Sequence, residues 1–204
     1  MANPYGMDEA CTRCPELSET RSTIVHGYGD VTADFLFVAA MPTAAADEQG
    51  HPVVGAEGAY SLTDLLDAIG FRTGDVDAAG QPVLDNAFVT HLTRCHHPDR
   101  SPTDREIEEC EPFLNAELRT INPDILLPLS ERVLHALAAD YTTKSPTALA
   151  IDEVHATEVR GRGFELIPLR DPRSMNDTEF EAAVDVLTAT IERDYRQTKG
   201  RRSR

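Results

Sequence analysis

The stretch Phe35-Leu36-Phe37-Val38-Ala39 decides the fold, because it is apolar throughout and has the length of a strand. A continuous apolar run, unlike an alternating one, is typical of a strand that is covered on both faces. Three further runs of this kind follow, at residues 87–92, 125–129 and 164–169. The sequence therefore predicts a sheet of four buried strands.

Segments with helical periodicity alternate with these runs. Their apolar residues recur every three or four positions within residues 62–69, 107–118, 133–137 and 180–191. The second of these helices begins at a capping box, Thr103-Asp104-Arg105-Glu106, and carries Cys110. Such alternation predicts an α/β fold in which helices cover both faces of an open, mainly parallel sheet. Binding groups are then expected in the loops after the strands, at residues 41–55, 93–102 and 170–176.

The length of 204 residues suits one domain, which we place at residues 1–198 and follow with a basic, disordered tail at residues 199–204. Residues 72–86 and 140–159 have the composition of solvent-exposed insertions. No apolar run is long enough to cross a bilayer, and nothing resembling a signal peptide stands at the start. We therefore expect a monomeric cytoplasmic protein without membrane contact.

The charge pattern is unusual, with 35 Asp and Glu against 19 Lys and Arg and a formal net charge of -16. Only two basic residues are lysines. The pattern resembles proteins of a high-salt cytoplasm, such as that of a halophilic archaeon, although an ordinary acidic protein is the alternative. Such acidity argues against a nucleic-acid partner unless arginines form a local positive groove. The arginines that cluster in this way are Arg94, Arg100, Arg160, Arg162, Arg170 and Arg173.

The four cysteines fall into two pairs, Cys11-x2-Cys14 and Cys95-x14-Cys110. Four thiolates from two distant segments suit one tetrahedral ligand set. In a cytosolic protein, free thiols bind metal more often than they form disulfides. Spacing alone does not choose between zinc and an iron-sulfur cluster, and four unrelated buried thiols are a third interpretation.

Three blocks of the chain carry a resemblance to known proteins. They run from Cys11 to Ala33, from Val38 to Gly58 and from Thr90 to Leu114. The second block contains Gln49-Gly50-His51-Pro52-Val53-Val54-Gly55, and the third contains Pro98-Asp99-Arg100-Ser101-Pro102 ahead of Cys110. In order and spacing these blocks resemble the iron-sulfur uracil-DNA glycosylases, the fourth and fifth families of that superfamily.

The resemblance implies an α/β/α sandwich and a 4Fe-4S cluster held by Cys11, Cys14, Cys95 and Cys110, with zinc as the alternative. It also implies a hydrolase of base-excision repair that acts on single-stranded or damaged DNA. Members of these families extrude a deaminated base into a pocket and cleave its N-glycosidic bond with water. In the family, base binding and bond cleavage depend on an acid or a bound water, a stacking aromatic ring, an asparagine and a histidine.

This chain departs from the family at each of those four positions. Ala40 stands in place of the acid, Val53 in place of the aromatic ring, His91 in place of the asparagine, and Asp171 in place of the histidine. By resemblance, the base pocket consists of Ala40, Met41, Pro42 and Val53.

Two functional hypotheses follow. In the first, the protein is a glycosylase with altered chemistry, in which Asp171 activates water or stabilises the sugar cation, His91 donates to the leaving base, and Asp47 is the reserve carboxylate. In the second, it is a non-catalytic DNA-binding or damage-sensing member of the same fold. Arg100, Arg170 and Arg173 are the expected DNA contacts in both. Met175 is either a wedge side chain that fills the place an extruded base leaves in the DNA stack, or a core residue.

Overall fold

The structure is a computed structural model that describes residues 9–53, 58–78 and 80–193. Among these residues, six strands form one sheet in the order β1-β5-β2-β6-β8-β7. The four inner strands are parallel, and the short edge strands β1 and β7 are antiparallel to their neighbours. The strands of this sheet are β1 (Tyr28–Gly29), β2 (Phe35–Ala39), β5 (Ala87–His91), β6 (Ile125–Pro128), β7 (Val159–Arg160) and β8 (Glu165–Leu166).

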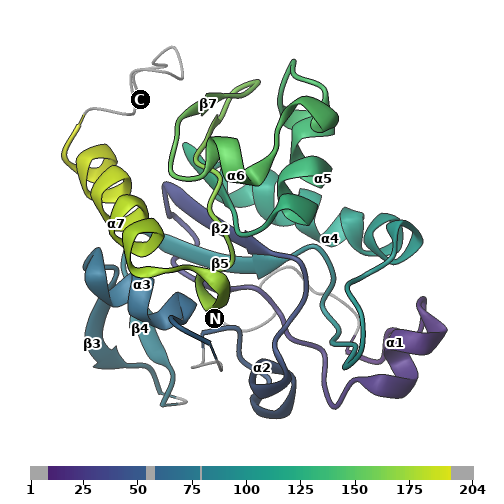
Figure 1. Cartoon of the computed structure of the whole chain (residues 1–204). Coiled ribbons are helices and arrows are strands. Elements are labelled where there is room, and N and C mark those ends of the chain that lie inside the picture. The colour runs from purple at the N-terminus through teal and green to yellow at the C-terminus, as the bar shows by residue number, and fades with distance from the viewer. Residues whose placement is uncertain (1–8, 54–57, 79, 194–204) are drawn as a thin grey trace.

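Helices cover both faces of the sheet, so the fold is the expected three-layer α/β/α sandwich. Helices α3 and α7 lie on one side of the sheet in Figure 1, and α4, α5 and α6 lie on the other. The helices are α1 (Pro15–Thr20), α2 (Ala44–Gln49), α3 (Leu62–Ala68), α4 (Asp104–Ile121), α5 (Glu131–Tyr141), α6 (Ile151–Val154) and α7 (Asp177–Glu192), with 3-10 turns η1 (Pro146–Ala148) and η2 (Pro172–Ser174). No described helix combines the length and the apolar character that a membrane span requires.

Successive side chains of β2 point to opposite layers, as the pleat of a strand requires. Phe35 and Phe37 are fully buried in a core with Leu65 of α3 and Leu187 of α7. Leu36 and Val38 belong to a second core, which contains Leu114 and Leu118 of α4 and Leu134 of α5. The continuous apolar run of β2 is therefore explained by its two buried faces.

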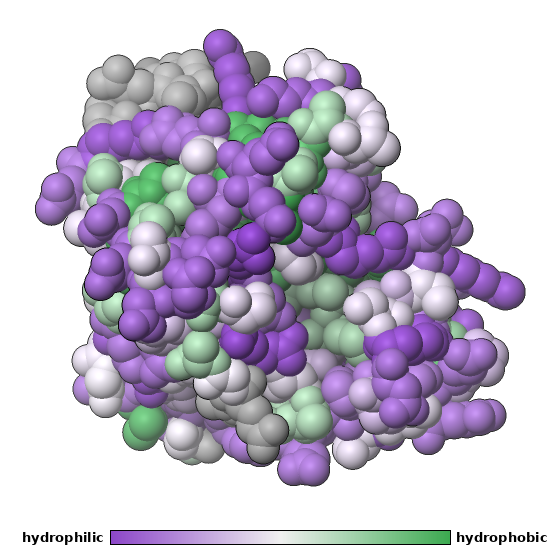
Figure 2. All heavy atoms as spheres, viewed as in Figure 1, coloured by the Kyte–Doolittle hydropathy of each residue, from purple (hydrophilic) through white to green (hydrophobic). Residues whose placement is uncertain are grey.

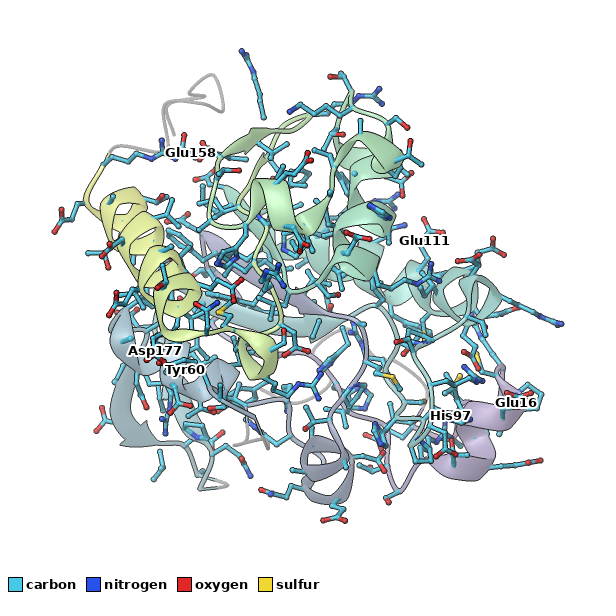
Figure 3. The ribbon with its side chains drawn as sticks, viewed as in Figure 1. Glu16, Tyr60, His97, Glu111, Glu158 and Asp177 are labelled. Carbon is cyan, nitrogen blue, oxygen red and sulfur yellow. The ribbon has the colours of Figure 1, made fainter. Side chains whose placement is uncertain are left out.

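The helix termini follow their sequence signals. Thr103 caps α4 through the expected capping box with Glu106, and α4 ends at Asn122, whose φ of 51° is left-handed. Ser61 caps α3 in the same way with Asp64. Tyr60, just before α3, stacks on Phe180 of α7 at 3.9 Å and donates to Asp177, so the two helices are joined at one end (Figure 3).

Two expectations about the fold need correction. The sheet has six described strands and not four, because β1 and β7 are two-residue strands that give no periodic signal. The described residues of 72–86 are largely exposed, as expected, and form a hairpin of β3 (Arg72–Val76) and β4 (Pro82–Leu84). The 140–159 region is not wholly exposed, because Leu149 and Ile151 are buried. The expected tail at residues 199–204 lies outside the described residues.

Candidate functional site

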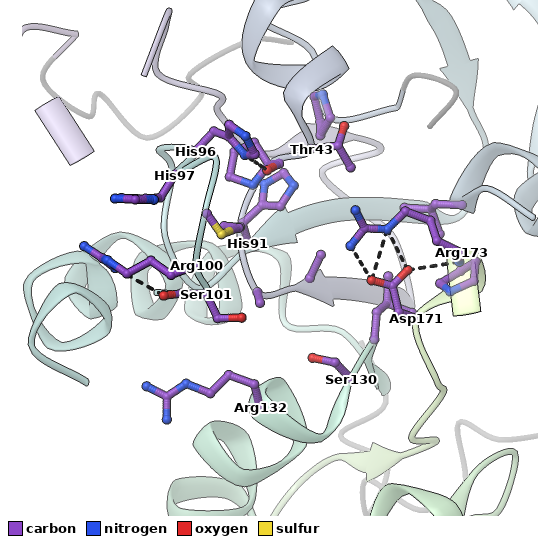
Figure 4. Close-up of a pocket in the computed structure, with 18 of the residues that line it drawn as sticks. Thr43, His91, His96, His97, Arg100, Ser101, Ser130, Arg132, Asp171 and Arg173 are labelled. Atoms are coloured by element: carbon purple, nitrogen blue, oxygen red, sulfur yellow. Dashed lines mark hydrogen bonds and ion pairs between the residues drawn. The ribbon is translucent and has the colours of Figure 1, made fainter. Parts of the chain in front are cut away.

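A cleft opens at the carboxyl ends of the parallel strands, where an α/β sheet places its ligands. Its volume is about 570 Å³, and Figure 4 shows the side chains that converge on it. The three expected loops contribute to its walls. The start of α5 contributes a fourth wall through Ser130 and Arg132, which the sequence analysis missed. Backbone hydrogen bonds from Leu92 to Ala39 and from Thr93 to Ala40 hold the first two loops together.

His91 lies on the floor of the cleft as the last residue of β5, opposite Ala39 of β2. Only 4% of the residue is exposed. Burial first, and the positive charge of Arg94 second, lower the pKa of His91 to about 3, so the imidazole is neutral at physiological pH. Its Nδ1 atom has no hydrogen-bond partner in the described part of the protein. His91 thus brings to the cleft lining a neutral imidazole, one nitrogen of which is buried and unpaired within the described residues.

Asp171 also lines the cleft, but its carboxylate is held by Arg173. The Arg173 backbone N–H and Nε both donate to Oδ1 at 3.0 Å, and Nη2 donates to Oδ2 at 2.5 Å. Asp171 is thereby the N-cap of the η2 turn. Gly58 lies against this turn, since a Cβ atom there would be 2.7 Å from the Arg173 Cα. The negative charge of Asp171 is consequently neutralised at the cleft.

The first loop supplies Ala40, Met41 and Pro42 to the cleft wall, as expected. Its Pro42 carbonyl lies 2.8 Å from Nδ1 of His96, which also lines the cleft. Val53 is placed differently, because it is buried in the core that contains α3 and α7 and is absent from the described cleft lining. Pro52 takes the lining position instead.

Asp47 is a buried residue of α2. Its carboxylate accepts hydrogen bonds from the backbone N–H groups of Ser22, at 2.7 Å, and Thr23, at 3.3 Å. It does not appear among the described residues that line the cleft. Asp47, the reserve catalytic carboxylate, thus links α2 to the segment that follows α1.

Of the three arginines expected to contact DNA, two line the cleft and one lies outside the described lining. Arg100 and Arg173 line the cleft, and so does Arg132. Arg170 instead binds two carboxylates, Asp152 at 2.5 Å and Glu179 at 2.9 Å, and is not a described lining residue. Arg100 pairs with Glu106 at 2.8 Å and with Glu16 at 2.5 Å, and this pairing lowers the pKa of Glu106 to about 2.

Met175 was expected as either a wedge or a core residue, and its burial decides the choice. Only 1% of Met175 is exposed, and it packs in the same core as Val53. A side chain in this position does not reach a DNA strand, so its place among the DNA contacts is corrected. The apolar contacts of Met175 stabilise the end of the η2 turn instead.

The four cysteines lie together at one corner of the molecule. Cys11 and Cys14 pack against Cys95, Leu17 and Ile24. The pKa of Cys14 rises to about 11, because the thiol is partly buried and because Cys110 and the other two cysteines lie close to it. Glu16 of α1 and His97 of the loop after β5 mark this corner in Figure 3. The two distant cysteine pairs are therefore brought together, as the sequence predicts.

Two arginines lie close to these sulfur atoms. Arg21 donates from Nη1 to the Cys95 sulfur at 3.1 Å and from Nη2 to the Cys11 carbonyl at 2.6 Å. Burial raises the pKa of the Cys110 thiol, and the nearby backbone and positive charge of Arg94 partly offset this effect. Donors of this kind stabilise sulfur that carries negative charge. No sequence motif around Arg21 indicates this role.

Within residues 9–53, 58–78 and 80–193, no three Cys, His, Asp or Glu side chains converge closely enough to hold one metal ion. Cys11, Cys14 and Cys95 belong to one apolar cluster, and Cys110 lies close enough to Cys14 to raise the pKa of that thiol. A single zinc ion would require all four sulfur atoms at about 2.3 Å from one centre.

A buried ion pair lies beside the cysteines and the cleft. Arg94 and Glu117 are joined by Nη2 and Oε2 at 2.6 Å, with 3% and 4% of their side chains exposed. Arg94 had been assigned to a positive groove at the surface. The structure places it in the interior, so it is unavailable to phosphate.

The surface agrees with the charge composition. Figure 2 shows a face that is mostly hydrophilic, with apolar residues in small separate patches. Against that acidic background, the described cleft lining contains three arginines, Arg100, Arg132 and Arg173, and two aspartates, Asp99 and Asp171. The cleft is therefore less negative than the protein as a whole.

Comparison with known proteins gives a consistent result. The family profile described as "Uracil DNA glycosylase superfamily" matches residues 26–192. The chain is 28% identical over 171 residues to the Type-4 uracil-DNA glycosylase of Archaeoglobus fulgidus. The aligned region covers 81% of this chain and 78% of that protein. It is 33% identical over 120 residues to the Type-4 uracil-DNA glycosylase of Pyrobaculum aerophilum, covering 58% of this chain and 55% of that protein. The Type-5 uracil-DNA glycosylase of the same organism is 22% identical over 201 residues and covers 90% and 87%. With its sandwich fold and the cleft at the strand ends, this chain belongs to the uracil DNA glycosylase superfamily.

Proposed function

We propose that this protein binds DNA along the cleft and accepts one extruded, deaminated base on the cleft floor. The observation that carries the proposal is His91, a neutral and buried imidazole whose Nδ1 atom is unpaired in the described structure. An unpaired buried polar atom costs free energy, and a ligand that pairs with it recovers that cost. The relatives named uracil-DNA glycosylase support a base as that ligand.

A neutral imidazole nitrogen makes one hydrogen bond, either as donor or as acceptor. The asparagine that occupies this position in the resembling families offers both a donor and an acceptor through its amide. His91 is therefore expected to recognise one atom of the base edge, either a carbonyl oxygen or a ring N–H group. Deaminated bases carry both, because deamination replaces an exocyclic amine with a carbonyl.

DNA as the partner is supported by the arginines at the cleft. Arg132 and Arg173 have partly exposed side chains, at 37% and 48%, and each pairs with a carboxylate at the rim. A phosphate group can compete for such pairs, because exposed ion pairs contribute little to stability. Strong salt screening is then expected to weaken but not abolish binding.

Cleavage of the glycosidic bond is the second candidate function, and Asp171 is the observation that favours it. In that reaction, a water oxygen bonds to the sugar C1′ atom while the bond to the base nitrogen breaks and its electron pair leaves with the base, and a proton of the water passes by way of Asp171 to the departing base. A bare carboxylate would repel the departing anion, but Arg173 neutralises Asp171. Because Arg173 also occupies both carboxylate oxygens, activation of water by Asp171 is expected to be slow.

We also propose that Cys11, Cys14, Cys95 and Cys110 hold a 4Fe-4S cluster, with zinc as the alternative. The donor set is compatible with such a cluster, because it consists of four neighbouring thiols and Arg21 donates to the Cys95 sulfur. A cubane binds each thiolate at a different iron atom, so its ligands need not converge on one point. The role of such a cluster here is structural, joining the N-terminal segment to α4.

Three further expectations remain proposals: a single domain at residues 1–198, a monomeric state, and a high-salt cytoplasm as the place of work. The acidic composition supports the last of these.

The experiment that tests the function is a binding and excision screen in multimolar KCl. Single-stranded oligonucleotides carry one uracil, hypoxanthine, xanthine or alkylated base, and an undamaged oligonucleotide is the reference. We expect tighter binding to a deaminated base than to the reference, with weak or absent excision. His91→Ala is expected to lose this preference, whereas the control His135→Ala removes an imidazole that binds the Leu149 carbonyl outside the cleft and keeps it. Equal affinity for damaged and undamaged strands would overturn the proposal.

A further inference from the structure

The Arg94–Glu117 ion pair lies in the interior, between the cleft floor and the cysteines. Both side chains are almost fully buried. The chemistry proposed for the cleft uses neither of them. A buried pair of charges is a poor source of stability, because apolar residues of similar size are often as stabilising or more so. Stability alone therefore does not explain why these two charges are buried here.

Toward the cleft, Arg94 binds the end of β5. Its Nη1 atom donates to the His91 carbonyl oxygen at 2.7 Å and also to the hydroxyl oxygen of Thr90. The Thr90 hydroxyl in turn donates to Glu117 at 2.6 Å. The last two residues of β5, including the one on the cleft floor, are thus fixed by one buried charged group.

Toward the cysteines, the same residue is held through its backbone. Its carbonyl oxygen accepts a hydrogen bond from the Val25 N–H group at 2.8 Å. Glu117 lies two turns after Cys110 on α4, and Cys95 follows Arg94 directly. The orientation of the guanidinium is therefore set from the cysteine side.

The packing around Glu117 leaves space for its carboxylate. A Cβ atom on Gly27 would lie 2.5 Å from the Glu117 Oε1 and 2.6 Å from the Phe88 ring. Glycine at this position thus makes room for a charged group in the core.

We propose that Arg94 is a positioning residue: held by Glu117, it fixes the backbone of His91 so that the imidazole meets an extruded base in one orientation. The inference rests on the proposed role of His91 in base recognition. Arg94 touches neither the base nor the cleft, and it acts through the His91 carbonyl oxygen.

The test uses the double variant Arg94→Met with Glu117→Leu, because the single variants would leave one buried charge unpaired and are expected to destabilise the fold. Three quantities are measured on the intact protein in multimolar KCl: the midpoint of thermal unfolding, the ¹⁵N and ¹H NMR signals of the His91 imidazole, and the preference for uracil-containing over cytosine-containing single-stranded DNA. The control is Arg193→Met with Glu165→Leu, which removes an ion pair between β8 and the end of α7.

We expect the Arg94 and Glu117 double variant to unfold near the wild-type midpoint while its His91 signals shift or broaden. We further expect its preference for uracil to fall by about tenfold, because small misalignment of a recognition group is costly. In the Arg193 and Glu165 control variant, we expect the His91 NMR signals and the preference for uracil to stay as in the wild type. Unchanged His91 signals in a folded double variant would overturn the inference. If the wild type itself shows no preference for uracil, the proposed function fails, while the NMR signals still decide whether Arg94 positions His91.

Discussion

The guanidinium of Arg173 contacts both carboxylate oxygens of Asp171 at the cleft, with Nε 3.0 Å from Oδ1 and Nη2 2.5 Å from Oδ2. This contact permits two roles for Asp171. It caps the η2 turn through the Arg173 backbone, and it places a carboxylate that is paired with Arg173 in the cleft wall. The two roles respond differently to substitution.

Asp171→Asn separates them, because asparagine also caps a turn. We expect the variant to lose at most about 1 kcal/mol of unfolding free energy. If Asp171 acts on water, excision of any base that the wild type removes falls by about 100-fold or more. Rates are measured in single-turnover reactions on uracil and hypoxanthine oligonucleotides. Equal rates for wild type and Asp171→Asn would exclude a catalytic Asp171.

Cys95→Ala is expected to lose the visible colour of the protein and its fold together. Cys95 is buried and packs against Cys11, Cys14 and Leu17, so removal of its sulfur takes away both a ligand and a core contact. Anaerobically purified wild type is expected to be brown and to contain iron and sulfide. Iron and sulfide analysis together with circular dichroism checks both statements. Zinc without iron in the wild type would contradict the cluster.

Arg21→Ala is expected to leave the cysteines in place but to shorten the life of the bound cluster in air. Arg21 donates to the Cys95 sulfur and to the Cys11 carbonyl, and loss of such outer contacts typically lowers metal affinity by about 10- to 100-fold. The rate of bleaching under oxygen measures the effect. Arg72→Ala is the control, since Arg72 pairs with Asp67 at the end of α3 and contributes to none of the shifts in cysteine pKa. Identical bleaching of both variants would show that the Arg21 contact does not protect the cluster.

Stability is expected to fall on mild acidification, because His91 is buried and neutral. Burial and the Arg94 charge lower its pKa to about 3 in the folded protein, whereas the unfolded chain has the ordinary value of about 6.5. Below about pH 6.5 the unfolded state binds a proton that the folded state does not. Each further pH unit down to about 3 then costs about 1.4 kcal/mol.

Chemical unfolding at pH 7.5 and pH 5.5 measures this dependence. The loss is expected to be smaller in His91→Gln than in the wild type by about 1.4 kcal/mol, and His135→Gln is the control. Burial also lowers the pKa of His26 and of His51, so part of the loss remains in His91→Gln. Glu106, with a pKa lowered to about 2, contributes its loss only below about pH 4.5, outside this range. Equal losses in wild type and His91→Gln would contradict a neutral, buried His91.

The parallel core of the sheet was predictable, because continuous apolar runs such as 35–39 record burial on two faces. The edge strands β1 and β7 were not predictable, since two paired residues leave no periodicity in a sequence. The cysteine corner was also predictable, because thiols of two segments in the resembling order imply a shared site.

The remaining errors concern side chains whose environment depends on distant segments. Arg94 was expected at the surface because arginine usually lies there, and its partner Glu117 is 23 positions away on α4. Val53 and Met175 occupy apolar positions that suit either a base pocket or a core, and only the packing against α3 and α7 decides between them. The fourth cleft wall at Ser130 carries an ordinary helix cap as its only signal.

The most direct test of the account is the ¹⁵N NMR signal of His91 Nδ1 during titration with single-stranded DNA that contains one uracil. We predict a shift of this signal with the uracil strand and none with the matched cytosine strand, while His97, another residue of the cleft lining, responds to both. A His97 response to both strands with an unchanged His91 signal would contradict the claim that the cleft floor accepts the base.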